Sequence, residues 1–176
     1  MKKSLIVAAV VAACSLAQAT TINWGLTAGS TLSEYAGGTA YLIWNSTTSE
    51  VLSYDGDLSK ATEFSSSKIK DTIISSTTVG ADGSIAGSEL VTSSSATGLG
   101  TGNKPFYIAI ISADGKSLTS LEATGSVNIR DTSFTATFQR AASAFSVSYT
   151  APIPEPTTVA LLALGLAALG LKRKVA

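Results

Sequence analysis

The chain contains no histidine, and cysteine occurs once, at Cys14. Histidine is the base of the common catalytic triads, a ligand in most zinc sites and the usual general base at neutral pH, so the chain lacks the residue that these sites need. Beyond Cys14 no thiol is left for a disulfide, a thiolate metal site or a cysteine nucleophile. We therefore expect no catalytic residue, no metal and no cofactor, and a protein that is not an enzyme.

Charge is scarce, since 14% of the residues are charged. Between Thr20 and Ala151 there are seven basic and eleven acidic residues, a formal net charge of −4. An acidic surface repels phosphate backbones, so nucleic acids are not expected as partners. The same stretch holds 24 serines and 20 threonines. This composition is common in exported β-rich proteins because threonine suits strands and serine suits turns.

The N-terminus has the three parts of a secretory signal in the right order. Lysines at positions 2 and 3 precede the apolar run Leu5–Ala13. Ala17 and Ala19 then form the small-x-small pattern that signal peptidase cleaves. The segment is shorter than a typical membrane span. The sequence therefore predicts a signal helix that is removed, so that the mature chain begins at Thr20.

Cys14 leaves a second kind of processing open. The sequence Val11-Ala12-Ala13-Cys14 has the pattern of a bacterial lipoprotein box, where cleavage would leave a lipid on the cysteine. The alternative is that Cys14 is one more small apolar residue of the signal segment. We favour the second interpretation because the site formed by Ala17 and Ala19 fits signal peptidase well.

Period-two alternation predicts strands through the middle of the chain. In the clearest case, Phe134, Ala136 and Phe138 alternate with polar neighbours. One apolar face on each strand is typical of an antiparallel sheet that covers a core on one side. The fold class expected is mainly β, with an antiparallel β-sandwich-like domain. The predicted strands are Thr21–Leu26, Thr39–Asn45, Pro105–Ser112, Val127–Ile129, Phe134–Phe138 and Phe145–Tyr149.

The segments between these strands predict turns, one loop and one insertion. Asp82-Gly83 predicts a turn, and Asp114-Gly115 predicts a β-hairpin. Asp57–Ile74 is the place for a short helical insertion, which Asp57 would cap. Thr92–Asn103 is expected to be a loop because of its serine and glycine content.

Two of these connections resemble ligand-binding loops in part. Asp55-Gly56-Asp57 begins like a calcium loop, but Lys60 and Ser66 stand where an EF-hand has glycine and glutamate. A turn with a helix cap is expected there, and a loose surface calcium site is the alternative. The glycine-rich stretch Gly98–Lys104 lacks the adjacent Gly-Lys-Ser/Thr of a phosphate loop, so a plain loop is expected.

Aromatic side chains leave a choice between core packing and sugar binding. Trp24 and Trp44 occupy predicted strands, and so does Tyr41. Aromatic residues at such positions belong more often to the core than to a sugar-stacking platform. The alternative is that Trp44 or Tyr41 is exposed and binds carbohydrate.

Composition divides the chain into four regions. Proline at positions 152, 154 and 156 disfavours helix and marks a linker before the apolar C-terminal segment. The regions are residues 1–19 as the signal peptide, 20–149 as the exported β-rich domain, 150–156 as the linker, and 157–176 as an apolar helix with a basic end.

The apolar segment is marginal as a membrane anchor. Val159–Leu171 contains only valine, alanine, leucine and glycine. As a helix, Thr157–Leu171 would be about 22 Å long, against about 30 Å of hydrocarbon. Its basic end would stay in the cytoplasm and stop transfer of the chain. That end consists of Lys172, Arg173 and Lys174.

The tail resembles the PEP-CTERM sorting signal of exported bacterial proteins. The resemblance rests on Pro154-Glu155-Pro156, the apolar segment and the basic end, in that order. It implies that Pro154, Glu155 and Pro156 are recognised by an exosortase-like transpeptidase while the apolar helix anchors the chain transiently in the inner membrane. It also implies a Gram-negative source, often one that makes exopolysaccharide. The exported domain itself resembles no family that we recognise.

These features together predict a non-enzymatic structural or adhesive protein. Its partners would be signal peptidase, the exosortase-like transpeptidase and, before processing, the membrane. Its destination would be the cell surface or the extracellular matrix. One alternative is a carbohydrate-binding module for exopolysaccharide, and a less favoured one is a glycan hydrolase.

Overall fold

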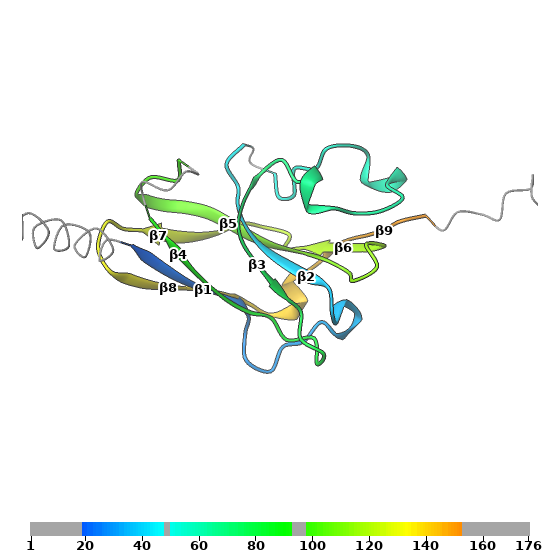
Figure 1. The fold of residues 1–176 in the computed structure, drawn as a ribbon, viewed down its shortest axis with the longest axis horizontal. Coiled ribbons are helices and arrows are strands. Elements are labelled where there is room, and N and C mark those ends of the chain that lie inside the picture. The colour runs from blue at the N-terminus through cyan, green and yellow to red at the C-terminus, as the bar shows by residue number, and fades with distance from the viewer. Residues whose placement is uncertain (1–18, 48–49, 93–97, 153–176) are drawn as a thin grey trace, which may run out of the picture.

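The computed structural model describes residues 19–47, 50–92 and 98–152. These residues form strands and single-turn 3-10 helices (Figure 1). The strands are β1 Thr20–Leu26, β2 Thr39–Trp44, β3 Thr72–Thr78, β4 Ala86–Val91, β5 Gly102–Ile111, β6 Ser117–Ser120, β7 Gly125–Ile129, β8 Phe134–Arg140 and β9 Val147–Thr150. The 3-10 helices are η1 Ser33–Tyr35, η2 Leu58–Lys60, η3 Ser66–Lys68 and η4 Ala142–Ala144. The prediction of a mainly β domain is confirmed.

The strands form two sheets. The smaller has the order β4-β1-β8, and the larger has the order β3-β2-β5-β6-β9, with β7 also paired to β5. Among the described strands, every pair is antiparallel except β1 and β8, which run parallel. The predicted antiparallel pairing is therefore wrong for β1 and β8. These strands are remote in sequence, so no hairpin dictates their relative direction.

The hydrophobic core lies between the two sheets. Trp24 and Phe138 are fully buried on the smaller sheet, and Phe106 and Ile108 on the larger. The ring centroids of Phe106 and Phe138 lie 6.4 Å apart, which joins the two sheets directly. Burying side chains of this size stabilises the fold by about 1.5–3 kcal/mol each. Trp24 is thus a core residue, in agreement with the favoured interpretation of its position.

β5 is buried on both faces over Phe106–Ile111, as its continuous apolar sequence predicts. One face turns toward the smaller sheet. The other is covered by the long connection between β2 and β3, which packs Leu52, Phe64 and Ile69 into the same core cluster. This connection forms the lobe above β5 and β6 in Figure 1.

The helical insertion predicted over residues 57–74 is wrong in two respects: this stretch forms only two separate turns within the connection, and residues 72–74 belong to β3. η2 and η3 are single 3-10 turns, so the stretch does not form a longer helix. Asp57 does cap η2, since its Oδ1 accepts a hydrogen bond from Ser59 N at 2.9 Å. Ser65 caps η3 through Ser67 N at 3.3 Å. Side chains that bond the nearby backbone in this way favour isolated turns over helix propagation.

Both predicted turns are present. Asp82-Gly83 lies between β3 and β4, and Asp114-Gly115 closes the β5–β6 hairpin with Gly115 at a φ of 68°. Strand boundaries nevertheless differ from the prediction by up to three residues. Phe145 follows η4 and lies outside β9, and the end of the predicted loop, Gly102-Asn103, belongs to β5. Residues 93–97 of that loop lie outside the described residues.

Candidate functional site

Most of the predicted sorting residues lie outside the described residues. The structure therefore shows where the chain enters and leaves the domain, and says nothing of the predicted apolar helix 157–176. Within the described part, no helix has the length and hydrophobicity to cross a membrane. The residues outside are Ala17, Pro154, Glu155, Pro156, Lys172, Arg173 and Lys174.

The two residues on either side of the predicted signal-cleavage bond, Ala19 and Thr20, lie in the folded domain. Ala19 is buried, and its carbonyl accepts a hydrogen bond from Phe134 N at 3.3 Å. Thr20 is fully buried as the first residue of β1, and its Oγ1 accepts a hydrogen bond from Arg130 N at 2.9 Å. The peptide bond between Ala19 and Thr20 is consequently part of the folded sandwich.

The chain leaves the domain through β9. In the described part of the chain, this strand pairs with β6 alone. Backbone pairing continues one residue past β9, because Ala151 N donates to Lys116 O at 2.7 Å. Ala151 is buried and Pro152 is exposed. The folded body therefore ends at Ala151, three residues before Pro154.

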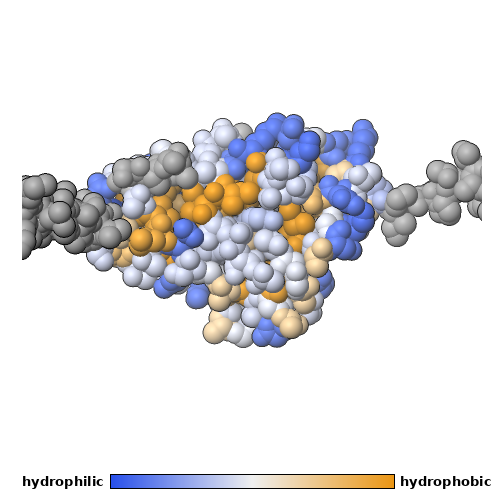
Figure 2. Space-filling view, in the orientation of Figure 1, coloured by the Kyte–Doolittle hydropathy of each residue, from blue (hydrophilic) through white to orange (hydrophobic). Residues whose placement is uncertain are grey.

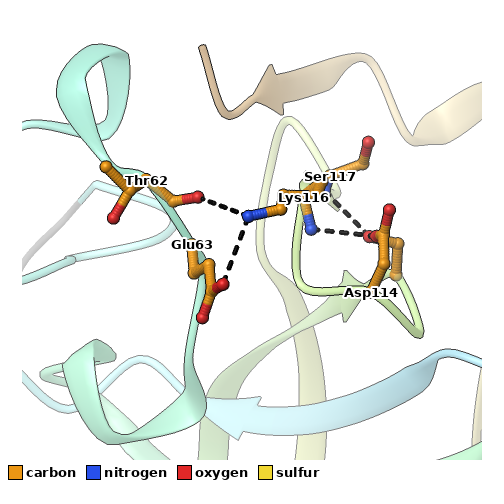
Figure 3. Close-up of polar contacts among 6 residues, drawn as sticks. Thr62, Glu63, Asp114, Lys116 and Ser117 are labelled. Carbon is orange, nitrogen blue, oxygen red and sulfur yellow. Dashed lines mark hydrogen bonds and ion pairs between the residues drawn. The ribbon is translucent and has the colours of Figure 1, made fainter. Parts of the chain in front are cut away.

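The hairpin that holds Ala151 is itself fastened to the β2–β3 connection (Figure 3). Lys116 Nζ donates to Thr62 O and to Glu63 Oε1, each at 3.2 Å. Within the hairpin, Asp114 Oδ1 accepts from Ser112 Oγ at 2.6 Å and from Lys116 N at 2.9 Å. These bonds hold the pKa of Asp114 below its ordinary value, and the bond from the Ser112 hydroxyl has the largest effect.

An open surface depression of about 330 Å³ lies in the β2–β3 connection. Its charged side chains face one another: Lys60 Nζ lies 3.1 Å from Asp57 Oδ2, and Lys68 Nζ lies 3.9 Å from Asp55 Oδ2. Figure 2 shows hydrophilic residues over this part of the molecule. The lining residues are Tyr54, Asp55, Gly56, Asp57, Lys60, Ala61, Thr62, Glu63 and Lys68.

The same contacts bear on the alternative of a calcium site. Asp57 Oδ1 already accepts from Ser59 N at 2.9 Å and from Ser59 Oγ at 2.5 Å. Asp55 faces Lys68 and also Lys70, whose Nζ lies 3.9 Å from Oδ1. In the described segments, no three acidic side chains converge in a way that would hold a metal ion. The carboxylates bind serine and lysine donors, which makes this loop a capped turn.

The glycine-rich stretch 98–104 does not form a cradle for phosphate. Leu99 is fully buried in the core, and Lys104 lies in β5 opposite Val127. A phosphate loop joins a strand to a following helix, whereas this stretch runs into β5.

The structure also contains a buried carboxylate that sequence reasoning missed. Asp71 Oδ1 accepts hydrogen bonds from Thr47 Oγ1 at 2.7 Å, Ser46 N at 3.2 Å and Thr47 N at 3.3 Å. Its Oδ2 accepts one from Tyr107 Oη at 2.9 Å. Burial and the neighbouring Asp71 carboxylate raise the pKa of Tyr107. No sequence motif identifies Asp71. The sequence shows only that an acidic residue stands directly before the strand that begins at Thr72.

The Asp71 network is closed rather than open to a ligand. Asp71 and Tyr107 are both buried, and neither lines the surface depression. All four hydrogen bonds to the carboxylate come from within the domain. The arrangement joins the end of β2, the start of β3 and the middle of β5, which is a structural role.

The predicted aromatic candidates are only partly accessible. Trp44 and Tyr41 are half-buried and pack against the core cluster. Tyr54, in the surface depression, makes an edge contact with Phe64 and accepts a hydrogen bond from Ser65 N at 3.0 Å. None of these contacts forms a row of exposed aromatic rings.

The comparison with known protein families identifies the tail. Residues 152–174 match the family model of the PEP-CTERM protein-sorting motif, starting one residue after the last backbone hydrogen bond of β9. No curated protein and no solved structure matches the chain. The motif supports an exported protein that an exosortase-type enzyme processes. The predicted resemblance is thus confirmed: the C-terminal tail of this chain is a PEP-CTERM protein-sorting motif.

Proposed function

We propose that this protein is a structural or adhesive component of the cell surface or extracellular matrix, without catalytic activity of its own. The observation that carries the proposal is the position of the sorting motif, which begins two residues after the end of β9. The sandwich is then a compact passenger that the tail delivers. Its closed Asp71 network supports a passenger built for stability.

In this proposal each part of the tail has a separate role. Pro154, Glu155 and Pro156 are recognised by the exosortase-like transpeptidase. The segment 159–171 holds the precursor in the inner membrane until processing, and the basic residues 172–174 stop its transfer. The producing cell is Gram-negative, and its exopolysaccharide is the surrounding matrix.

Localisation of a tagged precursor tests the proposal. An epitope tag in the exposed turn at residues 131–133 leaves both ends of the chain free. We expect the wild type at the cell surface or in the medium, and a variant with Pro154, Glu155 and Pro156 all changed to alanine in the inner membrane. Full-length wild-type protein in the cytoplasm would overturn the proposal.

Carbohydrate binding is a second candidate, favoured by the polar depression around Tyr54 and Lys60. Hydroxyl-rich sugars suit such a mixture of carboxylates, lysines and one tyrosine. We expect any glycan bound by the purified domain to be lost in Lys60→Ala and kept in Lys104→Ala, which lies in β5 outside the depression. Binding that is equal in both variants, or absent from the wild type, would remove this candidate.

A further inference from the structure

The sorting motif is joined to the folded domain by a very short tether. Ala151 is fixed by its hydrogen bond to Lys116 O, and Pro154 follows three residues later. Three residues span at most about 11 Å even when fully extended. Any enzyme that binds Pro154-Glu155-Pro156 must therefore approach the end of β9 to within that distance while the domain is folded.

The surface around this exit belongs to two elements. η2 lies against β9, and Lys116, whose carbonyl holds Ala151, binds Thr62 and Glu63 of the same connection. We name this surface the tail-exit face. It consists of Asp55, Asp57, Lys60, Glu63, Asp114 and Lys116.

The tail-exit face is polar and acidic, because its four acids outnumber its two lysines. Its Lys60 and Glu63 side chains are 83% and 72% exposed, and each of its two lysines forms an ion pair with one of its acids. Among the described residues, the large apolar side chain that is exposed is Leu90, which lies on β4 opposite Thr21, near the start of β1. Figure 1 places the start of β1 and the end of β9 at opposite ends of the domain. The tail-exit face therefore suits a polar protein surface rather than hydrocarbon.

We propose that the tail-exit face docks on the polar outer surface of the processing transpeptidase while the Pro-Glu-Pro motif occupies its active site. This inference rests on the proposed exosortase-type processing of the tail. Because the tether is short, the domain itself is part of the substrate: the enzyme holds both the motif and the end of the sandwich from which it emerges.

Photo-crosslinking of the full-length precursor tests this contact. p-Benzoylphenylalanine replaces Lys60 on the tail-exit face, Asp131 at the opposite end of the domain, or Thr157 beside the motif, in cells that make an epitope-tagged exosortase. We expect crosslinks to the enzyme from positions 60 and 157 and none from position 131. Asp131 is a matched control because it is also an exposed charged residue.

The outcomes separate this inference from the function on which it rests. A crosslink from position 157 without one from position 60 would overturn docking and leave processing intact. Absence of crosslinks from all three positions would overturn both. Equal crosslinking from positions 60 and 131 would mean unspecific contact, and would also overturn docking.

Lengthening the tether gives an independent readout. About 12 Gly/Ser residues inserted after Pro152 add a root-mean-square reach of roughly 19 Å, which lets the motif reach the enzyme without the domain. The crosslink from position 60 should then be lost while that from position 157 remains. Retention of the position-60 crosslink at its original yield would contradict a contact imposed by the tether.

A locked strand excludes the competing explanation, in which β9 peels away to lengthen the tether. Ser117 and Thr150 are opposite one another on β6 and β9, at a site next to the hydrogen-bonded pair Lys116 and Ala151. A disulfide between Ser117→Cys and Thr150→Cys would prevent peeling. Docking predicts that the oxidised precursor is processed as fast as the reduced one. A block on oxidation would show that β9 must open, and docking would be wrong.

Discussion

At the scale of single residues, one buried acid accepts several hydrogen bonds from distant parts of the chain. Asp71 receives four hydrogen bonds, from Ser46, from Thr47 twice and from Tyr107. Its carboxylate joins three segments that are distant in sequence. Removal of the acid leaves the Tyr107 hydroxyl buried without this acceptor, and such unsatisfied groups are costly.

Asp71→Ala should therefore destabilise the domain by about 3 kcal/mol, because several charge-assisted hydrogen bonds are lost at once. Urea unfolding of the domain from Thr20 to Pro152 measures the change. Asp131→Ala, at an exposed site, is the control and should leave the midpoint unchanged. An Asp71→Ala midpoint equal to that of the control would contradict the structural role of the network.

Serine hydroxyls give the exposed turns a dependence on pH. Ser59 and Ser84 donate to Asp57 and Asp82, and these bonds are the largest cause of the lowered pKa of each carboxyl. A carboxyl with a lower pKa in the folded state stabilises that state above its unfolded pKa, about 3.9. This contribution is lost as the pH falls through the folded pKa.

The melting temperature should consequently fall between pH 5 and pH 2, and fall less in the Ser59→Ala/Ser84→Ala variant. Differential scanning calorimetry across this range compares the two proteins. Two curves with the same slope in acid would show that these serine bonds contribute nothing to the pH dependence. Ser143→Ala, remote from both aspartates in the chain, should behave as the wild type does.

At the scale of elements, the sequence predicted strands where packing is periodic or uniformly apolar. β8 alternates cleanly, and the buried half of β5 is a continuous apolar run. β3 and β4 were missed for a physical reason. β3 is mostly serine and threonine after its two isoleucines, and β4 alternates in burial but not in apolar and polar residue type, so neither sequence shows the period-two pattern of a strand. Their pairing depends on neighbours that a single segment does not reveal.

Gly87 leaves room for a neighbouring side chain because it has no side chain of its own. A Cβ at this position would lie 2.3 Å from Trp24 Cε2, so the indole packs directly on the strand backbone. Gly87→Ala should destabilise the domain by about 1–3 kcal/mol, the usual cost of overpacking. Ser88→Ala, next to it on the outer side of β4, should cost less than about 1 kcal/mol. Chemical denaturation of both variants measures this difference, and equal stabilities would contradict the close approach of Trp24.

At the scale of the whole molecule, both ends of the domain lie next to the predicted processing sites. The tail was predictable from sequence because its motif is local: Pro-Glu-Pro, an apolar run and a basic end stand in order. The tail-exit face was not, because it requires η2, the β5–β6 hairpin and β9 to meet in space. The residues Lys60 and Lys116 are 56 positions apart and carry no common pattern.

The entry of the chain leads to a prediction about the order of events. Ala19 and Thr20 are buried, and Phe134 bonds the Ala19 carbonyl, so signal peptidase should cleave between them only before β1 is paired. Purified folded precursor in detergent should resist signal peptidase, whereas precursor diluted from urea into the enzyme should be cleaved before it refolds. Mass spectrometry identifies the product that begins at Thr20. Equal cleavage of both preparations would contradict this order.

The most direct test of the central claim is the intact mass of the protein recovered from the cell surface or the medium. An exported passenger with a processed sorting tail should begin at Thr20 and lack the apolar segment 159–171. The variant with alanine at positions 154, 155 and 156 should retain that segment and remain in the membrane. A surface protein that still carries its complete tail would contradict processing, and wild-type protein confined to the cytoplasm would contradict export.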